Sequence, residues 1–153
     1  FKHLKITTLS KSNLANKLTA LALNLAKNNK QRHEVIQDFM LTNDTTTLAT
    51  EVPIYFTKDD LLYFKSKGFT INSQDYQTPV TGHIDILQIR NNLIHILDYK
   101  PDADKEKPIQ QLTIYALAIA SRTKLDLKSF KCAWFDENNY YEFFPLHVVY
   151  KKK

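Results

Sequence analysis

Two aspartates and a lysine interrupt the apolar, β-rich runs of residues 82–100, GHIDILQIRNNLIHILDYK. Asp85 belongs to the first run, and Asp98 and Lys100 close the second. Carboxylates are preferred ligands of Mg²⁺ and Mn²⁺, and Mg²⁺ commonly takes one or two of them while it keeps waters and substrate phosphate oxygens. An ammonium group beside such a site stabilises negative charge that develops on a phosphate. The three residue types therefore indicate Mg²⁺ or Mn²⁺ and phosphoryl chemistry, provided that the fold brings them together.

A hairpin would bring the two aspartates together. Asn91 and Asn92 separate the two runs, and asparagine tolerates the left-handed backbone that a tight two-residue turn requires. In that register Asp85 lies opposite Asp98 and shares a face with Lys100, whereas a loop of odd length would shift the pairing. Opposed like charges destabilise a hairpin, so a bound cation would relieve the repulsion. The alternative is a structural ion pair between Lys100 and one of the acids.

Other segments must hold this hairpin in place. Leu14, Leu18, Leu21 and Leu25 recur at helical spacing and predict one apolar stripe. Periodicity and turn residues predict, in chain order, a helical segment within residues 11–41, a strand at 51–56, a short helix at 57–68, the hairpin, a helix at 108–122, and a second hairpin from 130–135 to 140–144. This order is that of an α/β fold in which helices flank a small mixed sheet.

Composition limits the class of protein. The chain has 153 residues, of which 43% are apolar and 24% charged, so we expect one globular domain. Cys132 is the one cysteine, which excludes an intramolecular disulfide and a cysteine-based zinc or iron–sulfur site. No apolar run reaches bilayer length, so we expect no membrane contact and an intracellular protein, cytoplasmic or nucleoid-associated. The net charge of +5 favours a polyanionic partner, with a solvated basic surface as the alternative.

Three motifs in order resemble the PD-(D/E)XK nuclease superfamily, in particular its RecB-type branch. Residues 82–85 resemble its G-x-x-D strand, residues 98–100 its D-x-K strand, and residues 111–115 its helix with Q-x-x-x-Y. The resemblance covers residues 33–136, although the family's proline before the first aspartate is Ile84 here. It implies a restriction-endonuclease-like core in a single domain that spans the chain, with an N-terminal helical segment (1–41), a catalytic core (51–136), and a terminal strand with a basic tail (137–153).

The resemblance implies a role for each matching position. Asp85 and Asp98 would be metal ligands, together with the backbone carbonyl of Tyr99. Lys100 would orient the attacking water, lower its pKa, or stabilise negative charge on the scissile phosphate. Gln111 and Tyr115 would hold Lys100 or a phosphate from one helix face, although Tyr115 is almost as well explained by aromatic packing.

Relatives of this branch also carry an upstream histidine on a helix or a glutamate on a strand. His33 resembles the first and Glu51 the second, and Glu34 is a third candidate. His33 shares the stripe of Ile36 and Met40, so a packed core histidine is its alternative explanation. The sequence leaves the choice of upstream metal ligand open.

The implied function is Mg²⁺- or Mn²⁺-dependent hydrolysis of DNA phosphodiester bonds, with single- or double-stranded DNA as partner. A helicase or another partner domain and a homodimer are further expectations, whereas exonuclease or endonuclease action and DNA or RNA preference stay open. The alternatives are a catalytically inactive DNA-binding or assembly module of a repair, defence or mobile-element system, and a metal-dependent hydrolase of nucleotides. Candidate phosphate contacts, each also explicable as a solvated surface lysine, are Lys58, Lys65, Lys67, Lys105, Lys107 and Lys151 to Lys153. Candidate stacking residues, provided that they are exposed and not packed in the core, are Tyr63, Phe64 and Tyr76.

Overall fold

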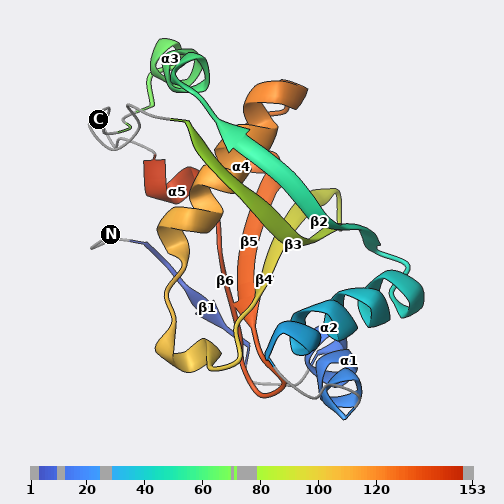
Figure 1. Ribbon diagram of the computed structural model, residues 1–153. Helices are drawn as coiled ribbons and strands as arrows, with labels where there is room; N and C mark the ends of the chain where they lie inside the picture. The colour runs from blue at the N-terminus through green and yellow to red at the C-terminus, as the bar shows by residue number, and fades with distance from the viewer. Residues whose placement is uncertain (1–3, 10–12, 25–28, 70, 72–78, 150–153) are drawn as a thin grey trace.

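The described part of the chain forms an α/β fold around a mixed, open six-stranded sheet with strand order β1-β6-β5-β4-β3-β2 (Figure 1). The computed structural model describes residues 4–9, 13–24, 29–69, 71 and 79–149. Strands β4 and β5 pair in parallel, and the other neighbours pair antiparallel. The strands are β1 (Thr7–Thr8), β2 (Thr47–Phe56), β3 (Val80–Arg90), β4 (Leu93–Tyr99), β5 (Phe130–Phe135) and β6 (Tyr140–Phe143).

Helices cover the sheet on both faces. They are α1 (Leu14–Leu23), α2 (Asn29–Asn43), α3 (Lys58–Ser66), α4 (Ile109–Thr123) and α5 (Leu146–Val149), with short 3₁₀ turns at Ala103–Lys105 and Leu127–Ser129. In β4, the fully buried Ile96 packs in the core with α4, whereas the next residue, Leu97, packs in the core with α1 and α2. Because successive strand residues point to opposite faces, burial on both faces explains the continuous apolar run of β4.

The first predicted hairpin is present with the predicted register. Asn91 and Asn92 have φ angles of 51° and 61°, the left-handed values of a tight hairpin turn. Arg90 pairs with Leu93, and the ladder of β3 and β4 continues to Ile86 opposite Leu97. Beyond that pair the strands diverge, since β3 stays paired with β2 and β4 with β5. The position of divergence is also the position of the two aspartates.

The predicted N-terminal helical segment is divided, and its stripe differs from the prediction. Helix α1 ends at Leu23 and α2 begins at Asn29. The buried face of α1 includes Ala15, Leu18 and Ala22, whereas Leu14 and Leu21 are exposed. Small alanines let the helix approach its neighbours closely, so they occupy the buried face in place of these leucines. Leu25 lies outside the described residues.

The other predicted elements are present with small differences. The strand predicted at 51–56 extends back to Thr47, and the second hairpin is formed by β5 and β6. The predicted terminal segment 137–153 contains the predicted strand β6. It also contains the helical turn α5, which was not predicted from the sequence, and neither was β1. No helix in the described ranges is both long and apolar enough to cross a membrane.

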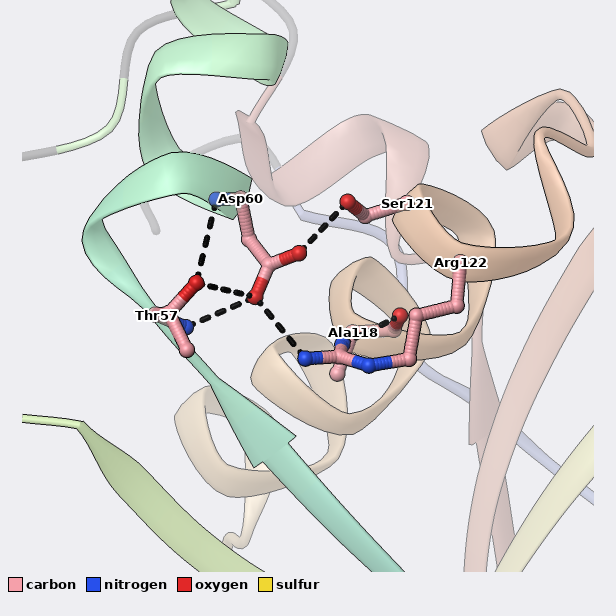
Figure 2. Close-up of polar contacts among 5 residues, drawn as sticks. All are labelled: Thr57, Asp60, Ala118, Ser121 and Arg122. Atoms are coloured by element: carbon pink, nitrogen blue, oxygen red, sulfur yellow. Dashed lines mark hydrogen bonds and ion pairs between the residues drawn. The ribbon is translucent and has the colours of Figure 1, made fainter.

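A buried carboxylate joins α3 to α4 (Figure 2). Thr57 and Asp60 form a capping box at the start of α3. Asp60 also accepts hydrogen bonds from Ser121 Oγ at 2.6 Å and Arg122 Nη2 at 3.2 Å, both from the end of α4. These bonds outweigh the cost of burial and hold the pKa of Asp60 below its usual value. Asp60 therefore caps one helix and fixes its position on another.

Candidate active site

The carboxyl groups of Asp85 and Asp98 meet where β3 and β4 diverge. The register that ends with Ile86 opposite Leu97 places the two aspartates next in line, and each carboxyl group shifts the pKa of the other. Asp85 Oδ2 also accepts a hydrogen bond from the backbone N–H of Tyr99 at 3.1 Å. The two groups that the sequence paired therefore lie close enough to interact electrostatically.

The two carboxyl groups differ in their ease of ionisation. Burial, and next the neighbouring Asp85, raise the pKa of Asp98 to about 7. Burial also opposes ionisation of Asp85, but hydrogen bonds to His33 and Asp98 outweigh it and lower the pKa of Asp85. Two buried carboxylates this close cannot both be charged without a cation beside them.

Lys100 supplies one such positive charge. Its Nζ lies 3.1 Å from Asp98 Oδ2, and its side chain is partly buried. Burial works against its charged form, but Asp98 outweighs that effect and raises the pKa of Lys100. This contact is an ion pair but not a hydrogen bond. Among the described residues, the buried Asp98 Oδ2 therefore has no hydrogen-bond donor. That oxygen can accept another electropositive partner.

His33 approaches the other carboxyl group, that of Asp85, from helix α2. Its Nδ1 lies 3.3 Å from Asp85 Oδ2, and the edge of its ring packs against the Tyr99 ring at 5.0 Å between centroids. The hydrogen bond to Asp85 outweighs partial burial and raises the pKa of His33. His33 thus faces the acids, which argues against its alternative as a packed core histidine.

Glu51, the other upstream candidate, lies on the strand next to Asp85. On either side of Glu51, Thr50 pairs with Ile86 of β3 and Val52 pairs with Ile84. Glu51 therefore lies across from Asp85, although these two residues do not form a regular strand pair. The backbone of Glu51 is left-handed, with φ of 51°. His33 and Glu51 therefore approach Asp85 from different elements, whereas Glu34 is exposed and makes no hydrogen bond or ion pair with the described residues.

Gln37 was not identified from the sequence. It lies one helical turn after His33, is 4% exposed, and donates a hydrogen bond from Nε2 to Glu51 Oε1 at 2.6 Å. The spacing of four residues from His33 was the available signal, because residues four apart share a helix face. The contact of Gln37 with Glu51 depends on the packing of α2 beside β2, which only the structure shows.

Gln111 and Tyr115 lie together on α4 but not at the acids. Gln111 Nε2 donates to the Tyr115 hydroxyl at 2.8 Å, and within the described residues neither side chain forms a hydrogen bond or ion pair with Lys100, Asp85 or Asp98. The prediction that they hold Lys100 is thus not met in this arrangement, and a contact with phosphate stays a prediction.

A solvent-open hollow of about 440 Å³ lies beside these two residues. Its lining includes Gln111, Tyr115, Lys107, Gln110 and Thr81. The lining combines one cationic side chain with amide and hydroxyl groups, which are suitable donors for a phosphate oxygen.

The remaining candidate contacts differ in exposure. Lys58, Lys65, Lys67, Lys105 and Lys107 are exposed. Phe64 is 2% exposed and packs in the core, so it does not meet the condition of exposure for base stacking. Tyr63 is half-buried beneath the ammonium groups of Lys67 and Lys124, at 4.9 and 4.0 Å from its ring centre. Tyr76 and Lys151 to Lys153 lie outside the described residues.

The donor atoms at the acids suit a hard divalent cation. They comprise two carboxylates and an imidazole, and one buried carboxylate oxygen lacks a hydrogen-bond donor among the described residues. In the described parts of the chain, no group of three histidine, cysteine, aspartate or glutamate side chains is arranged to hold a metal ion as it stands. His33 contacts Asp85 and Lys100 contacts Asp98.

No protein-family model and no curated protein matches this chain. The inference of function therefore rests on the geometry and chemistry of its own residues.

Proposed function

We propose that the chain is a metal-dependent deoxyribonuclease of the PD-(D/E)XK type, built on a restriction-endonuclease-like core. The observation that carries this proposal is the meeting of Asp85 and Asp98 at the divergence of β3 and β4, with Lys100 on one acid and His33 on the other. Buried like charges that are brought together at a cost in stability are typical of a functional site.

Asp85, Asp98 and the backbone carbonyl of Tyr99 would hold Mg²⁺ or Mn²⁺, with His33 or Glu51 as a further ligand. When bound, the cation would activate water near neutral pH and polarise the phosphoryl oxygens.

The protein groups have separable roles in this proposal. Lys100 carries a positive charge beside Asp98, where it would stabilise negative charge on the scissile phosphate or orient the attacking water. The hydrogen bond from the Tyr99 N–H and the contact with His33 would fix the orientation of the Asp85 carboxylate. The hollow lined by Lys107, Gln110 and Gln111 would bind the phosphate backbone away from the scissile bond.

The decisive experiment is incubation of the protein with linear duplex, single-stranded and supercoiled DNA in Mg²⁺, Mn²⁺ or EDTA. We expect metal-dependent cleavage that falls at least roughly 100-fold in Asp98→Asn and Lys100→Met, since each removes a group at the reacting phosphate. Lys100→Met should still bind Mn²⁺ because an ammonium is not a ligand. Asp102→Asn, an exposed acid in the next turn, is the matched control and should cleave like the wild type. Equal cleavage by all four proteins would refute the proposal.

The ion pair between Lys100 and Asp98 favours a second candidate, an inactive nuclease-fold module that binds DNA or serves in assembly. In that case the pair is structural, and Asp98→Asn should strongly lower the metal-free melting temperature by leaving Lys100 unpaired. In the nuclease proposal the same change removes a repulsive charge, so the metal-free melting temperature should hold or rise. Thermal unfolding in EDTA therefore separates the two candidates without an activity assay.

A further inference from the structure

The hydrogen bond between Gln37 and Glu51 has features that a stabilising surface contact would not require. The Gln37 amide is buried on α2, whereas the Glu51 side chain belongs to an exposed residue of edge strand β2. Their contact, at 2.6 Å, is a short hydrogen bond to a carboxylate. This hydrogen bond holds the flexible Glu51 side chain, which would otherwise move freely in water, in one orientation.

The backbone of Glu51 shows the same constraint. The other described non-glycine residues with positive φ are Asn91 and Asn92 in the hairpin turn and Lys124 at the end of α4. Glu51 is the one within a strand, where a left-handed glutamate costs free energy and interrupts pairing with β3. Residues held in such conformations concentrate at functional sites, and here the interruption faces Asp85.

Helix α2 aims two side chains at the same place. His33 contacts Asp85 on β3, and Gln37, four residues later, contacts Glu51 on β2. Since residues four apart share a helix face, one face of α2 orients two neighbouring carboxylates. Groups that orient metal-binding carboxylates typically change metal affinity 10- to 100-fold when removed.

We propose that buried Gln37 is a positioning residue that holds the Glu51 carboxylate beside Asp85 and so strengthens binding of a divalent cation. This inference rests on the proposed function, because it assigns Glu51 to the same cation site. Gln37 itself contacts no substrate or cation, and its effect is transmitted through Glu51.

The test is calorimetric titration of Mn²⁺ into the metal-free protein, with metal-free thermal unfolding measured in parallel. Glu51→Gln keeps an acceptor for Gln37 but removes the charge, so it should fold normally and bind Mn²⁺ roughly tenfold more weakly. Gln37→Met keeps the buried volume and the Glu51 charge but removes the hydrogen bond, so it should weaken Mn²⁺ binding by a similar factor. The matched control is Gln88→Met, which removes another buried amide that binds Asp44 and Thr47 away from the site. It should lower the melting temperature and leave Mn²⁺ affinity unchanged.

Other outcomes separate this inference from the proposed function. Unchanged Mn²⁺ affinity in Gln37→Met and Glu51→Gln, with affinity lost in Asp98→Asn, would overturn the inference alone. Equal weakening in Gln88→Met would also overturn it, because the effect would then follow from loss of any buried amide. A wild-type protein that binds no Mn²⁺ would overturn the proposed function and this inference with it.

Discussion

Gly82 allows α4 to approach the strand that carries Asp85. The Tyr115 hydroxyl and ring lie where a Cβ atom at position 82 would be, so no larger residue fits without displacement of the tyrosine. The glycine and the tyrosine of the two sequence motifs are thus explained by one contact. This contact also gives Tyr115 a packing role, independent of any role with phosphate.

Gly82→Ala should therefore destabilise the protein by about 1–3 kcal/mol, because the added Cβ would displace the buried Tyr115 ring from its packed position. Tyr115→Phe removes the hydroxyl that overlaps most, so adding it to Gly82→Ala should recover part of the loss. Urea unfolding of the two single variants and the double variant would measure the coupling between the positions. Strictly additive losses would show that the contact is not the reason for a glycine at this position.

His95 gives a second prediction at this scale, away from the proposed site. Burial, and next the positive charge of Arg90, lower the pKa of His95 to about 4. Arg90 Nη2 lies 3.2 Å from His95 Nδ1, which suits a neutral imidazole that accepts the hydrogen bond. The unfolded chain binds a proton near pH 6.5 and the folded chain near pH 4. Stability from the neutral histidine is thus complete above about pH 6.5 and decreases as the pH falls toward 4.

The expected loss between these pH values is at most about 3 kcal/mol, since each pKa unit corresponds to about 1.4 kcal/mol. His95→Gln should remove that part of the pH dependence, whereas His147→Gln, at an exposed histidine of α5, is the control for loss of a histidine. The free energy of unfolding measured from pH 4 to pH 8 would check this. An identical slope for the wild type and His95→Gln would contradict the assigned burial of a neutral histidine.

At the scale of elements, Asp60 determines how α3 meets α4. Its carboxylate caps α3 and accepts hydrogen bonds from Ser121 and Arg122 (Figure 2). Arg122 in turn stacks on the Tyr55 ring at 3.7 Å. The pKa of Asp60 is lower in the folded protein than in the unfolded chain. The ionised carboxylate therefore stabilises the fold above the usual aspartate pKa, and this stabilisation is lost as the pH falls through the pKa of the folded protein.

Asp60→Asn should destabilise the protein by about 1–3 kcal/mol at pH 7, because the amide cannot replace all the charge-assisted bonds and leaves Arg122 without its carboxylate. The variant should also lose less stability than the wild type on acidification below pH 4. Denaturant unfolding at pH 7 and pH 3 would test both statements. Asp59→Asn, at the neighbouring exposed position, is the control. An equally large loss in that variant would indicate an effect of general helix charge instead.

Elements also differ in how well the sequence predicts them. The Asn91-Asn92 turn fixes the register of its hairpin locally, so the meeting of Asp85 and Asp98 could be predicted without knowledge of the fold. Gln37 could not be identified in this way, because its partner Glu51 is met only when α2 packs beside β2. The two-residue β1 carries too little pattern to be recognised, and its pairing with β6 joins distant parts of the chain.

The whole molecule carries a net charge of +5, which favours DNA but does not locate it. Lys107 differs from the other candidate lysines because it lines the hollow with Gln110, Gln111 and Tyr115. If the phosphate backbone occupies this hollow, the loss of Lys107 should reduce the number of counterions released on binding. A lysine that only contributes to the net charge would have a weaker effect.

Lys107→Gln should therefore weaken DNA binding and reduce the slope of log affinity against log salt by about 1. Lys128→Gln is a control of equal charge change, because Lys128 is exposed and already lies 3.8 Å from Asp126. Fluorescence anisotropy with labelled DNA at several salt concentrations would give both slopes, measured in an Asp98→Asn background so that the DNA stays intact. Equal changes in the two variants would mean that binding follows net charge alone, and the assignment of the hollow to the phosphate backbone would then fail.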